Sequence, residues 1–197
     1  MAGAGLLLAG CNHDAFVNPT TQIRFGEWRI DPQTDRVTGA PLSNSLLVTN
    51  RVSHGGMLFP PPARLQLLCF KKHAAMNFAF EFKIGSTRNA EVAYRFDGKP
   101  GHEPRARIVN DYLSVLIDDP YEVKQFVGEM ATSDVLYLRI RSLTATGRTS
   151  AEFKVAGASP AIAAAYASCP LTAAARTSAM SPRAVRDDKE EKDDKED

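Results

Sequence analysis

Hydrophobic and polar residues alternate along three successive stretches of the chain, between residues 65 and 96. An apolar residue at every second position is typical of a strand that buries one face. The apolar positions are Leu65, Leu67 and Cys69 in the first stretch, Phe78, Phe80, Phe82 and Ile84 in the second, and Val92, Tyr94 and Phe96 in the third. The pattern predicts three adjacent antiparallel strands, with the sulfur of Cys69 facing the core.

The same alternation predicts shorter strands on both sides of these three. They cover residues 23–30, 46–52, 106–109, 112–117, 135–141 and 149–155. The first contains Trp28, the only tryptophan of the chain, which we expect to be buried. Clusters of Pro, Gly, Asn and Asp separate the strands and mark turns and loops. One of these loops contains a stiff run of three prolines, residues 60–62.

A first helix is predicted after Asp118-Asp119-Pro120. An aspartate can cap the free amides of a helix, and proline suits the first turn. The apolar residues that follow recur at helical spacing and would form the buried face: Val123, Phe126, Val127 and Met130. The paired aspartates could instead bind a metal ion or act as acid and base.

A second helix is predicted after Ser159-Pro160, by the same capping argument. Its spacing turns Ile162, Tyr166 and Cys169 toward the core. Together these elements predict a mostly β, α+β fold. We expect a small antiparallel sheet or sandwich with one internal and one C-terminal helix, stapled by a disulfide.

A chain of 197 residues with 44% hydrophobic residues is long enough for one domain with a sizeable core. The net charge is +1, but residues 187–197 hold eight acidic residues and three lysines, so the remainder carries about +6. Such mild basicity argues against a nucleic-acid partner. No apolar run is long enough to cross a membrane. We expect a β-rich domain over 23–170, then a disordered Ala/Ser-rich linker and acidic tail over 171–197.

A short apolar run near position 11 ends in Leu8-Ala9-Gly10-Cys11. It resembles the lipobox of bacterial lipoproteins, in which the cysteine receives the lipid. The resemblance implies a signal remnant over 1–11 with Cys11 as the lipid-attachment residue, and a tether over 12–22. Asn12, where an aspartate commonly retains lipoproteins at the inner membrane, implies the inner face of the outer membrane. No Lys or Arg precedes the run, so a coincidental buried segment is the alternative.

Two cysteines remain besides Cys11, namely Cys69 and Cys169. An exported chain would normally pair them. Closing a loop of about 100 residues stabilises a fold by about 4.7 kcal/mol in the chain-entropy model. The alternative is two buried free thiols in a cytosolic protein. Because neither a CxxC motif nor a Cys/His pair at zinc spacing occurs, we expect no metal or other cofactor.

Four short motifs accompany Trp28 and Cys69. They are Val92-Ala93-Tyr94-Arg95-Phe96-Asp97-Gly98, Val135-Leu136-Tyr137-Leu138-Arg139, Phe153-Lys154-Val155-Ala156-Gly157 and Ala167-Ser168-Cys169. The set resembles the TagO/VasI-like periplasmic proteins associated with type VI secretion. The resemblance implies a small β-rich domain with a disulfide and an accessory role. It transfers no catalytic residue, and turn and sheet chemistry alone would also explain Arg95 and Asp97.

The sequence contains no nucleophile elbow, no zinc-protease motif and no glycine-rich phosphate or dinucleotide loop. Its four histidines, His13, His54, His73 and His102, are expected in loops or turns without ligand-like spacing. We therefore expect a non-enzymatic envelope lipoprotein, held at the membrane by its N-terminal lipid. It would act as an accessory binding module whose partners are subunits of a larger envelope complex.

The alternative is a periplasmic binder or hydrolase of glycan or peptidoglycan fragments. The basic loop over 99–107 and the aromatic residues of the sheet suggest it. Candidate binding residues are Trp28, Arg95, Asp97, Arg105 and Arg107.

Overall fold

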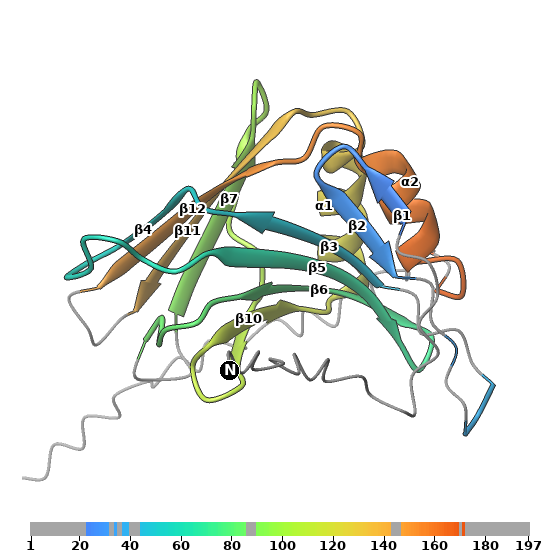
Figure 1. Cartoon of the computed structure of the whole chain (residues 1–197), viewed down its shortest axis with the longest axis horizontal. Coiled ribbons are helices and arrows are strands. Elements are labelled where there is room, and N and C mark those ends of the chain that lie inside the picture. The colour runs from blue at the N-terminus through green and yellow to red at the C-terminus, as the bar shows by residue number, and fades with distance from the viewer. Residues whose placement is uncertain are drawn as a thin grey trace, which may run out of the picture.

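The computed structural model describes residues 23–31, 34, 37–39, 44–85, 90–142, 147–169 and 171, which form two antiparallel sheets and two helices (Figure 1). The larger sheet contains, in spatial order, β1 (Ile23–Phe25), β2 (Trp28–Asp31), β3 (Asn44–Thr49), β5 (Ala63–Phe70), β6 (His73–Ala79), β10 (Ser114–Ile117) and β9 (Arg107–Val109). The smaller sheet contains β4 (Val52–His54), β12 (Arg148–Lys154), β11 (Val135–Ser142), β7 (Ala90–Phe96) and β8 (Gly101–His102). The helices are α1 (Pro120–Met130) and α2 (Ala158–Ala165). The predicted mostly β fold with two helices is confirmed.

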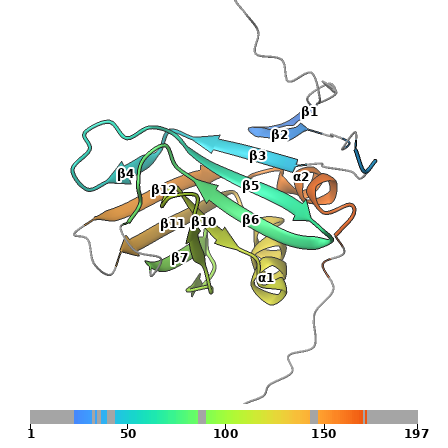
Figure 2. The same ribbon diagram turned by 90° about the horizontal axis from the view of Figure 1, so that it is seen from below.

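The five-stranded sheet and the two helices together cover one face of the seven-stranded sheet (Figure 2). Aromatic rings fill the space between the layers. The ring of Phe78 on β6 lies 6.0 Å from the rings of both Phe126 on α1 and Phe153 on β12, measured between centroids. One core therefore joins both sheets and α1.

The three stretches predicted as adjacent strands are divided between the two sheets. β5 and β6 are neighbours, joined by the two-residue turn Lys71-Lys72. β7 instead pairs along its whole length with β11 in the other sheet, so the prediction that it adjoins β6 is wrong. Alternation identifies a buried face, but both sheets of a sandwich bury the same kind of face.

The second stretch leaves regular strand pairing at Ala79, earlier than predicted. The side chains of Phe80 and Ile84 are nevertheless buried. The amide of Phe80 donates to the carbonyl of Leu113 at 2.8 Å, and that of Ile84 to the carbonyl of Tyr112 at 2.9 Å. Tyr112 has a φ of 67°, so the segment that provides these two carbonyls is not in the strand conformation. Two separate hydrogen bonds therefore replace regular strand pairing after Ala79, while every second side chain still points into the core.

Residues 23–30, predicted as one strand, form a hairpin. β1 and β2 pair through Phe25 and Trp28, and Gly26 turns the chain with a φ of 59°. A residue without Cβ adopts this conformation without strain. Trp28 is completely buried, as predicted, and its Nε1 donates to the carbonyl of Val155 at 3.3 Å. This hydrogen bond connects the larger sheet to the end of β12.

α1 begins where the capping signal predicts. Asp119 is the N-cap, and its Oδ1 accepts hydrogen bonds from the amides of Tyr121 at 2.9 Å and Glu122 at 3.1 Å. The predicted face of Val123, Phe126, Val127 and Met130 is buried. At the other end of α1, the carbonyl of Glu129 accepts from Lys99 Nζ at 2.5 Å and from the Ser133 hydroxyl at 2.8 Å. Both ends of the helix are thus satisfied by polar side chains.

α2 differs from its prediction at both ends. Gly157, in the left-handed conformation, precedes the helix without a side-chain cap, so Ser159 lies inside the helix instead of capping it. The helix ends at Ala165, and Cys169 lies in the following turn. The predicted disulfide between Cys69 and Cys169 is confirmed, with the two Cα atoms 5.8 Å apart. It ties the end of β5 to the turn after α2.

Several predictions fall outside the described residues: lipid attachment at Cys11, the loop position of His13, the tether over 12–22, and the linker and tail apart from Leu171. Neither helix in the described ranges combines the length and apolar character needed to span a membrane.

Candidate functional site

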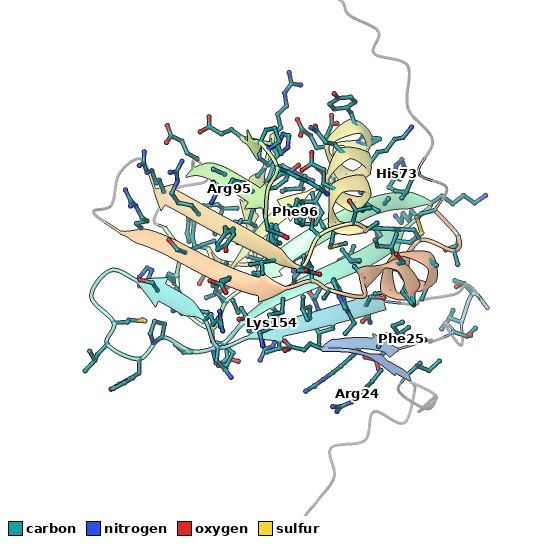
Figure 3. All side chains as sticks on the ribbon, turned by 90° about the horizontal axis from the view of Figure 1, so that it is seen from above. Arg24, Phe25, His73, Arg95, Phe96 and Lys154 are labelled. Atoms are coloured by element: carbon teal, nitrogen blue, oxygen red, sulfur yellow. A yellow bond between two sulfur atoms is a disulfide. The ribbon has the colours of Figure 1, made fainter. Side chains whose placement is uncertain are left out.

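An open groove of about 1000 Å³ crosses the outer face of the five-stranded sheet. Outward-facing side chains line it, because alternate residues of each strand point away from the core. They include Arg51, Ser53, Ala93, Arg95, Glu103, Tyr137, Arg139, Ser150 and Glu152. Figure 3 looks onto this sheet, with Arg95 labelled on β7. The spacing of these side chains is set by strand register, so the groove is largely preformed.

Tyr137 lies at the centre of the groove, on the middle strand β11. Its side chain is 41% exposed, and register places it between Arg95 of β7 and Glu152 of β12. The guanidinium carbon of Arg95 lies 5.5 Å from the centre of the Tyr137 ring, within cation–π range. The pair offers a ligand both an apolar platform and hydrogen-bond donors.

The three arginines of the groove differ in their ionic partners. Arg51 pairs with Glu152. The guanidinium of Arg139 lies 3.9 Å from the carboxylate of Glu103, at the outer limit of an ion pair. Arg95 has no carboxylate partner among the residues that the structure describes. Arg95 is therefore the donor most available to an anionic ligand.

Positive charge continues along the same face beyond the groove. Arg141 and Arg148 lie directly opposite each other on β11 and β12. Glu91 lies beside Arg141 on β7, but no ion pair joins the two. Like charges in register destabilise an antiparallel pair. The neighbouring Glu91 offsets part of this repulsion at Arg141, and an anion near the face would relieve more of it.

A polar cluster lies at the edge of the groove, between β8 and α1. His102 Nδ1 is 3.1 Å from Gln125 Nε2, and His102 Nε2 is 2.8 Å from a Glu129 carboxylate oxygen, at ion-pair distance but without hydrogen-bond alignment. The His102 ring also lies 5.0 Å from the ring of Tyr94. Burial, and then the carboxylates of Glu129 and Glu122, raise the pKa of Tyr94 well above its usual range. Because both nitrogens of His102 face protein groups, the cluster fits a structural role that holds β8 against α1.

Two of the predicted binding candidates serve the fold. The ring of Trp28 is buried and does not reach the surface. Asp97 Oδ1 accepts hydrogen bonds from the amides of Val135 at 2.7 Å and Asp134 at 3.1 Å. The Val135 amide is the main cause that lowers the pKa of Asp97. Turn chemistry accounts for Asp97, which leaves ligand binding by it without support.

The basic loop over 99–107 lies apart from the arginines of the groove. Arg105 is exposed between β8 and β9 and does not line the groove. Arg107 lies on β9, at the edge of the larger sheet, where it pairs with Asp118. Of the five predicted candidates, the groove contains only Arg95. Binding by Arg105 or Arg107 stays a prediction.

A second cavity, of about 660 Å³, lies at the turn between β9 and β10. Asn110, Asp111 and Tyr112 all have positive φ there, a conformation that Asn and Asp adopt more readily than Tyr does. Lys83 Nζ lies 3.1 Å from the Asp111 carboxylate and 5.9 Å from the centre of the Tyr112 ring. The protein's own groups brace this turn, so the groove is the better candidate for a ligand.

The described histidines lie at strand ends on β4, β6 and β8, and not in the loops or turns that were predicted. His54 shares a hydrogen bond of 2.8 Å with the hydroxyl of Thr149, and burial lowers its pKa. Within the described ranges, no group of three or more His, Cys, Asp or Glu side chains is placed to hold a metal ion.

Most of the groove residues were not predicted from the sequence. One signal was present: the predicted strand over 135–141 places Tyr137, Arg139 and Arg141 on its outward face. This face combines an aromatic ring with two guanidinium groups, which can bind an anion. Arg51 carried no such signal, because it reaches the groove only through the pairing of β4 with β12. Alternation along one strand does not encode pairing between distant strands.

Comparisons with known proteins show the fold but no family. No protein-family model matches the chain. No curated protein is significantly similar to it. The fold is similar to the crystal structure of invasion associated protein B from Bartonella henselae, with a TM-score of 0.51 and 16% sequence identity, over 75% of this chain and 97% of that one. At this identity the likeness concerns the fold alone.

Proposed function

We propose that this chain is a non-enzymatic binding module of the cell envelope, which recognises an acidic partner through the groove on its five-stranded sheet. One observation carries the proposal. Arg95, without a carboxylate partner in the described part of the chain, lies against the exposed ring of Tyr137 inside an open groove. Guanidinium groups bind carboxylates through two parallel hydrogen bonds. A preformed concave surface with a few polar groups and an aromatic ring is typical of a ligand site.

The disulfide supports an envelope location. Disulfides persist in oxidising compartments such as the periplasm and are rare in the cytosol. In this proposal, a lipid on Cys11 holds the domain at the inner face of the outer membrane, and residues 12–22 separate the domain from the bilayer. The groove then faces the periplasm, where it meets its partner.

We infer that the partner is a protein subunit of an envelope assembly, in keeping with the resemblance to TagO/VasI-like accessory proteins. An acidic segment of that subunit would place carboxylates against Arg95 and Arg139. A neighbouring side chain of the segment would pack on Tyr137. The remaining groove residues would exclude water around these contacts.

An anionic glycan fragment, such as a muropeptide, is the second candidate. The exposed ring of Tyr137 favours it, because the apolar face of a sugar can pack on an aromatic ring. Muropeptides also carry carboxylates that suit the guanidinium of Arg95. A hydrolytic role has less support, because both nitrogens of His102 face protein groups.

Photocrosslinking from the groove separates these candidates. The crosslinking residue p-benzoylphenylalanine replaces Tyr137 in one strain and the exposed Lys72 in a control strain. We expect a discrete protein adduct from position 137 only, and its loss when Arg95→Glu is added. Binding of a purified muropeptide that falls at least about tenfold in Arg95→Glu would instead favour the glycan. A groove that gives neither result is not the binding site.

A further inference from the structure

The connection between β4 and β5 exposes three consecutive apolar side chains, which we call the apolar tip. They are Met57, Leu58 and Phe59, with exposed fractions of 43%, 86% and 87%. In Figure 1 this connection extends at the end of the molecule that lies away from α1 and α2. Contiguous apolar surface on a folded domain marks a place where it meets something other than water.

Contacts at its base hold the apolar tip away from the core. The amide of Gly55 donates to the carbonyl of Arg148 at 3.2 Å, and the amide of Met57 to the carbonyl of His54 at 3.1 Å. On the other side, the three prolines at 60–62 fix their own φ angles and stiffen the approach to β5. The tip is therefore a projection with a rigid frame, which is not free to fold back.

Two arginines without an ion-pair partner in the described part of the chain lie near the base of the apolar tip. The two arginines within residues 51–64 do not add to this charge, because Arg51 pairs with Glu152 and Arg64 with Glu81. Arg148, whose carbonyl holds the base of the tip, lies opposite Arg141 on the neighbouring strand. Neither arginine has an ion-pair partner among the residues described by the structure. An apolar tip beside two unpaired arginines is complementary to a surface that is apolar inside and anionic outside.

We propose that the apolar tip inserts into the interfacial region of a bilayer containing anionic phospholipid, with Arg141 and Arg148 against the headgroup phosphates. Apolar side chains combined with nearby cations are what bind peripheral proteins to such membranes. The prolines also favour insertion, because they bring no backbone N–H group that would lose its water. A projecting tip can insert into a fluid lipid surface. The competing hypothesis is that the tip binds an acidic pocket of another protein.

This contact adds to the functions proposed above. The lipid proposed for Cys11 carries at least two acyl chains and would by itself attach the chain stably to the bilayer. The tip would add a second contact between the folded domain and the same surface. It would also fix the orientation of the domain on the membrane, which a tether alone does not do.

Vesicle binding tests the proposal on the full chain carrying Cys11→Ala, oxidised to form its disulfide. The probe is co-sedimentation with vesicles of phosphatidylcholine and phosphatidylglycerol. We expect Leu58→Ser with Phe59→Ser to lower the partition coefficient about tenfold or more. The matched control is Phe70→Ser, which removes a 62% exposed ring at the opposite end of β5 and should change nothing. Thermal unfolding checks that each exposed substitution leaves the fold intact.

Charge removal tests the second half of the contact. Arg141→Gln with Arg148→Gln should weaken binding to the anionic vesicles about tenfold and reduce its dependence on salt. Lys71→Gln with Lys72→Gln removes the same charge at the β5–β6 turn, beyond the far end of β5, and should leave binding unchanged.

A fluorescent reporter tests insertion itself. In Phe59→Trp, the new indole should shift its emission to shorter wavelength on vesicles and be quenched by brominated lipid. Phe70→Trp is the control and should show neither effect, while the native Trp28 is buried in both variants.

Failure of the wild-type domain to bind vesicles would overturn the proposal, as would equal binding by the tip variant. A third outcome also overturns it. If the domain ignores vesicles but forms a protein complex or a dimer that the tip variant loses, the tip is a protein interface.

Discussion

The two sheets of the sandwich bury similar inner faces but present different outer faces. The outer face of the seven-stranded sheet carries half-buried apolar and amide side chains, including Leu46, Val48, Gln66, Leu68, Asn77 and Leu116. The outer face of the five-stranded sheet carries Arg95, Tyr137, Arg139, Arg141 and Arg148. The first set contributes burial to the fold. The second set places Arg141 directly opposite Arg148, an arrangement that agrees with the binding role proposed for this face.

The polar contacts of the two faces differ in the same way. Across β5 and β6, the Asn77 side-chain amide donates to the side-chain carbonyl of Gln66 at 2.9 Å. Across β11 and β12, Arg141 instead faces Arg148. The seven-stranded face is internally complementary at this amide pair. The five-stranded face pairs Arg51 with Glu152 but leaves Arg141 and Arg148 without an ion-pair partner among the described residues.

Removing the disulfide should have the largest effect on stability and should spare the groove. Cys69→Ala with Cys169→Ala should lower the free energy of unfolding by about 4 kcal/mol, because the bond closes a loop with a sequence separation of 100. Urea unfolding measures this loss. Ligand binding at low temperature should persist, because the bond ties β5 to the turn after α2. If a folded variant lost ligand binding at the groove, the groove would depend on the disulfide between β5 and the turn after α2.

Relieving the β5–β6 turn should stabilise the larger sheet. Lys71 and Lys72 have φ values of 49° and 65°, the type I′ geometry that favours Asn-Gly. Lys71→Asn with Lys72→Gly should raise the free energy of unfolding by about 1 kcal/mol. Lys71→Gln with Lys72→Gln removes the same charges without relieving the backbone, so it should be neutral. Equal effects of the two pairs would contradict the backbone explanation.

The amide pair on the larger sheet should behave as one unit. Gln66→Val alone should cost about 1 kcal/mol, because it leaves the half-buried Asn77 amide unpaired. Adding Asn77→Val should recover most of this loss, since the Asn77 carbonyl oxygen already lacks a partner. A double-mutant cycle measures the coupling. Additive losses would show that this face is not internally complementary.

Reversing one charge on the five-stranded sheet should give the smallest change in the free energy of unfolding. It should stabilise the fold while it weakens ligand binding. Arg148→Glu should raise the free energy of unfolding by about 0.5 kcal/mol, because it replaces a like-charge pair with Arg141 by an opposite one. The same change should weaken binding of an anionic ligand. Thermal unfolding and calorimetry are measured side by side, with Arg148→Gln as the intermediate. A loss of stability would contradict the view that this face is kept for binding.

Local chemistry made parts of the fold predictable from sequence. α1 follows from Asp119, which caps the helix, and from apolar spacing within one segment. The same argument failed for α2, because Gly157 provides the start through its left-handed backbone and Ser159 is already helical. The sheet that holds β7 also escaped prediction, because pairing with β11 depends on residues far along the chain. Features set by neighbouring residues, such as the α1 cap, could be predicted from the sequence. Strand pairing between distant segments could not.

The candidate site was predictable only in part, for the same reason. Arg95 was identified through a family resemblance, whereas its contact with Tyr137 depends on the register of β7 against β11. Trp28 drew attention as a lone tryptophan but serves the core. Candidates chosen by residue type alone mix structural and surface roles. The outward face of a strand, considered as a whole, separates them better.

A titration followed by NMR would show whether ligands bind the outer face of the five-stranded sheet. Amide chemical shifts of the labelled full chain are recorded with an acidic peptide and with a muropeptide. We expect saturable shifts at Ala93, Arg95, Tyr137 and Ser150 with at least one ligand, and their loss in Arg95→Glu. Shifts that cluster on the seven-stranded sheet, or no saturable shift with either ligand, would contradict it.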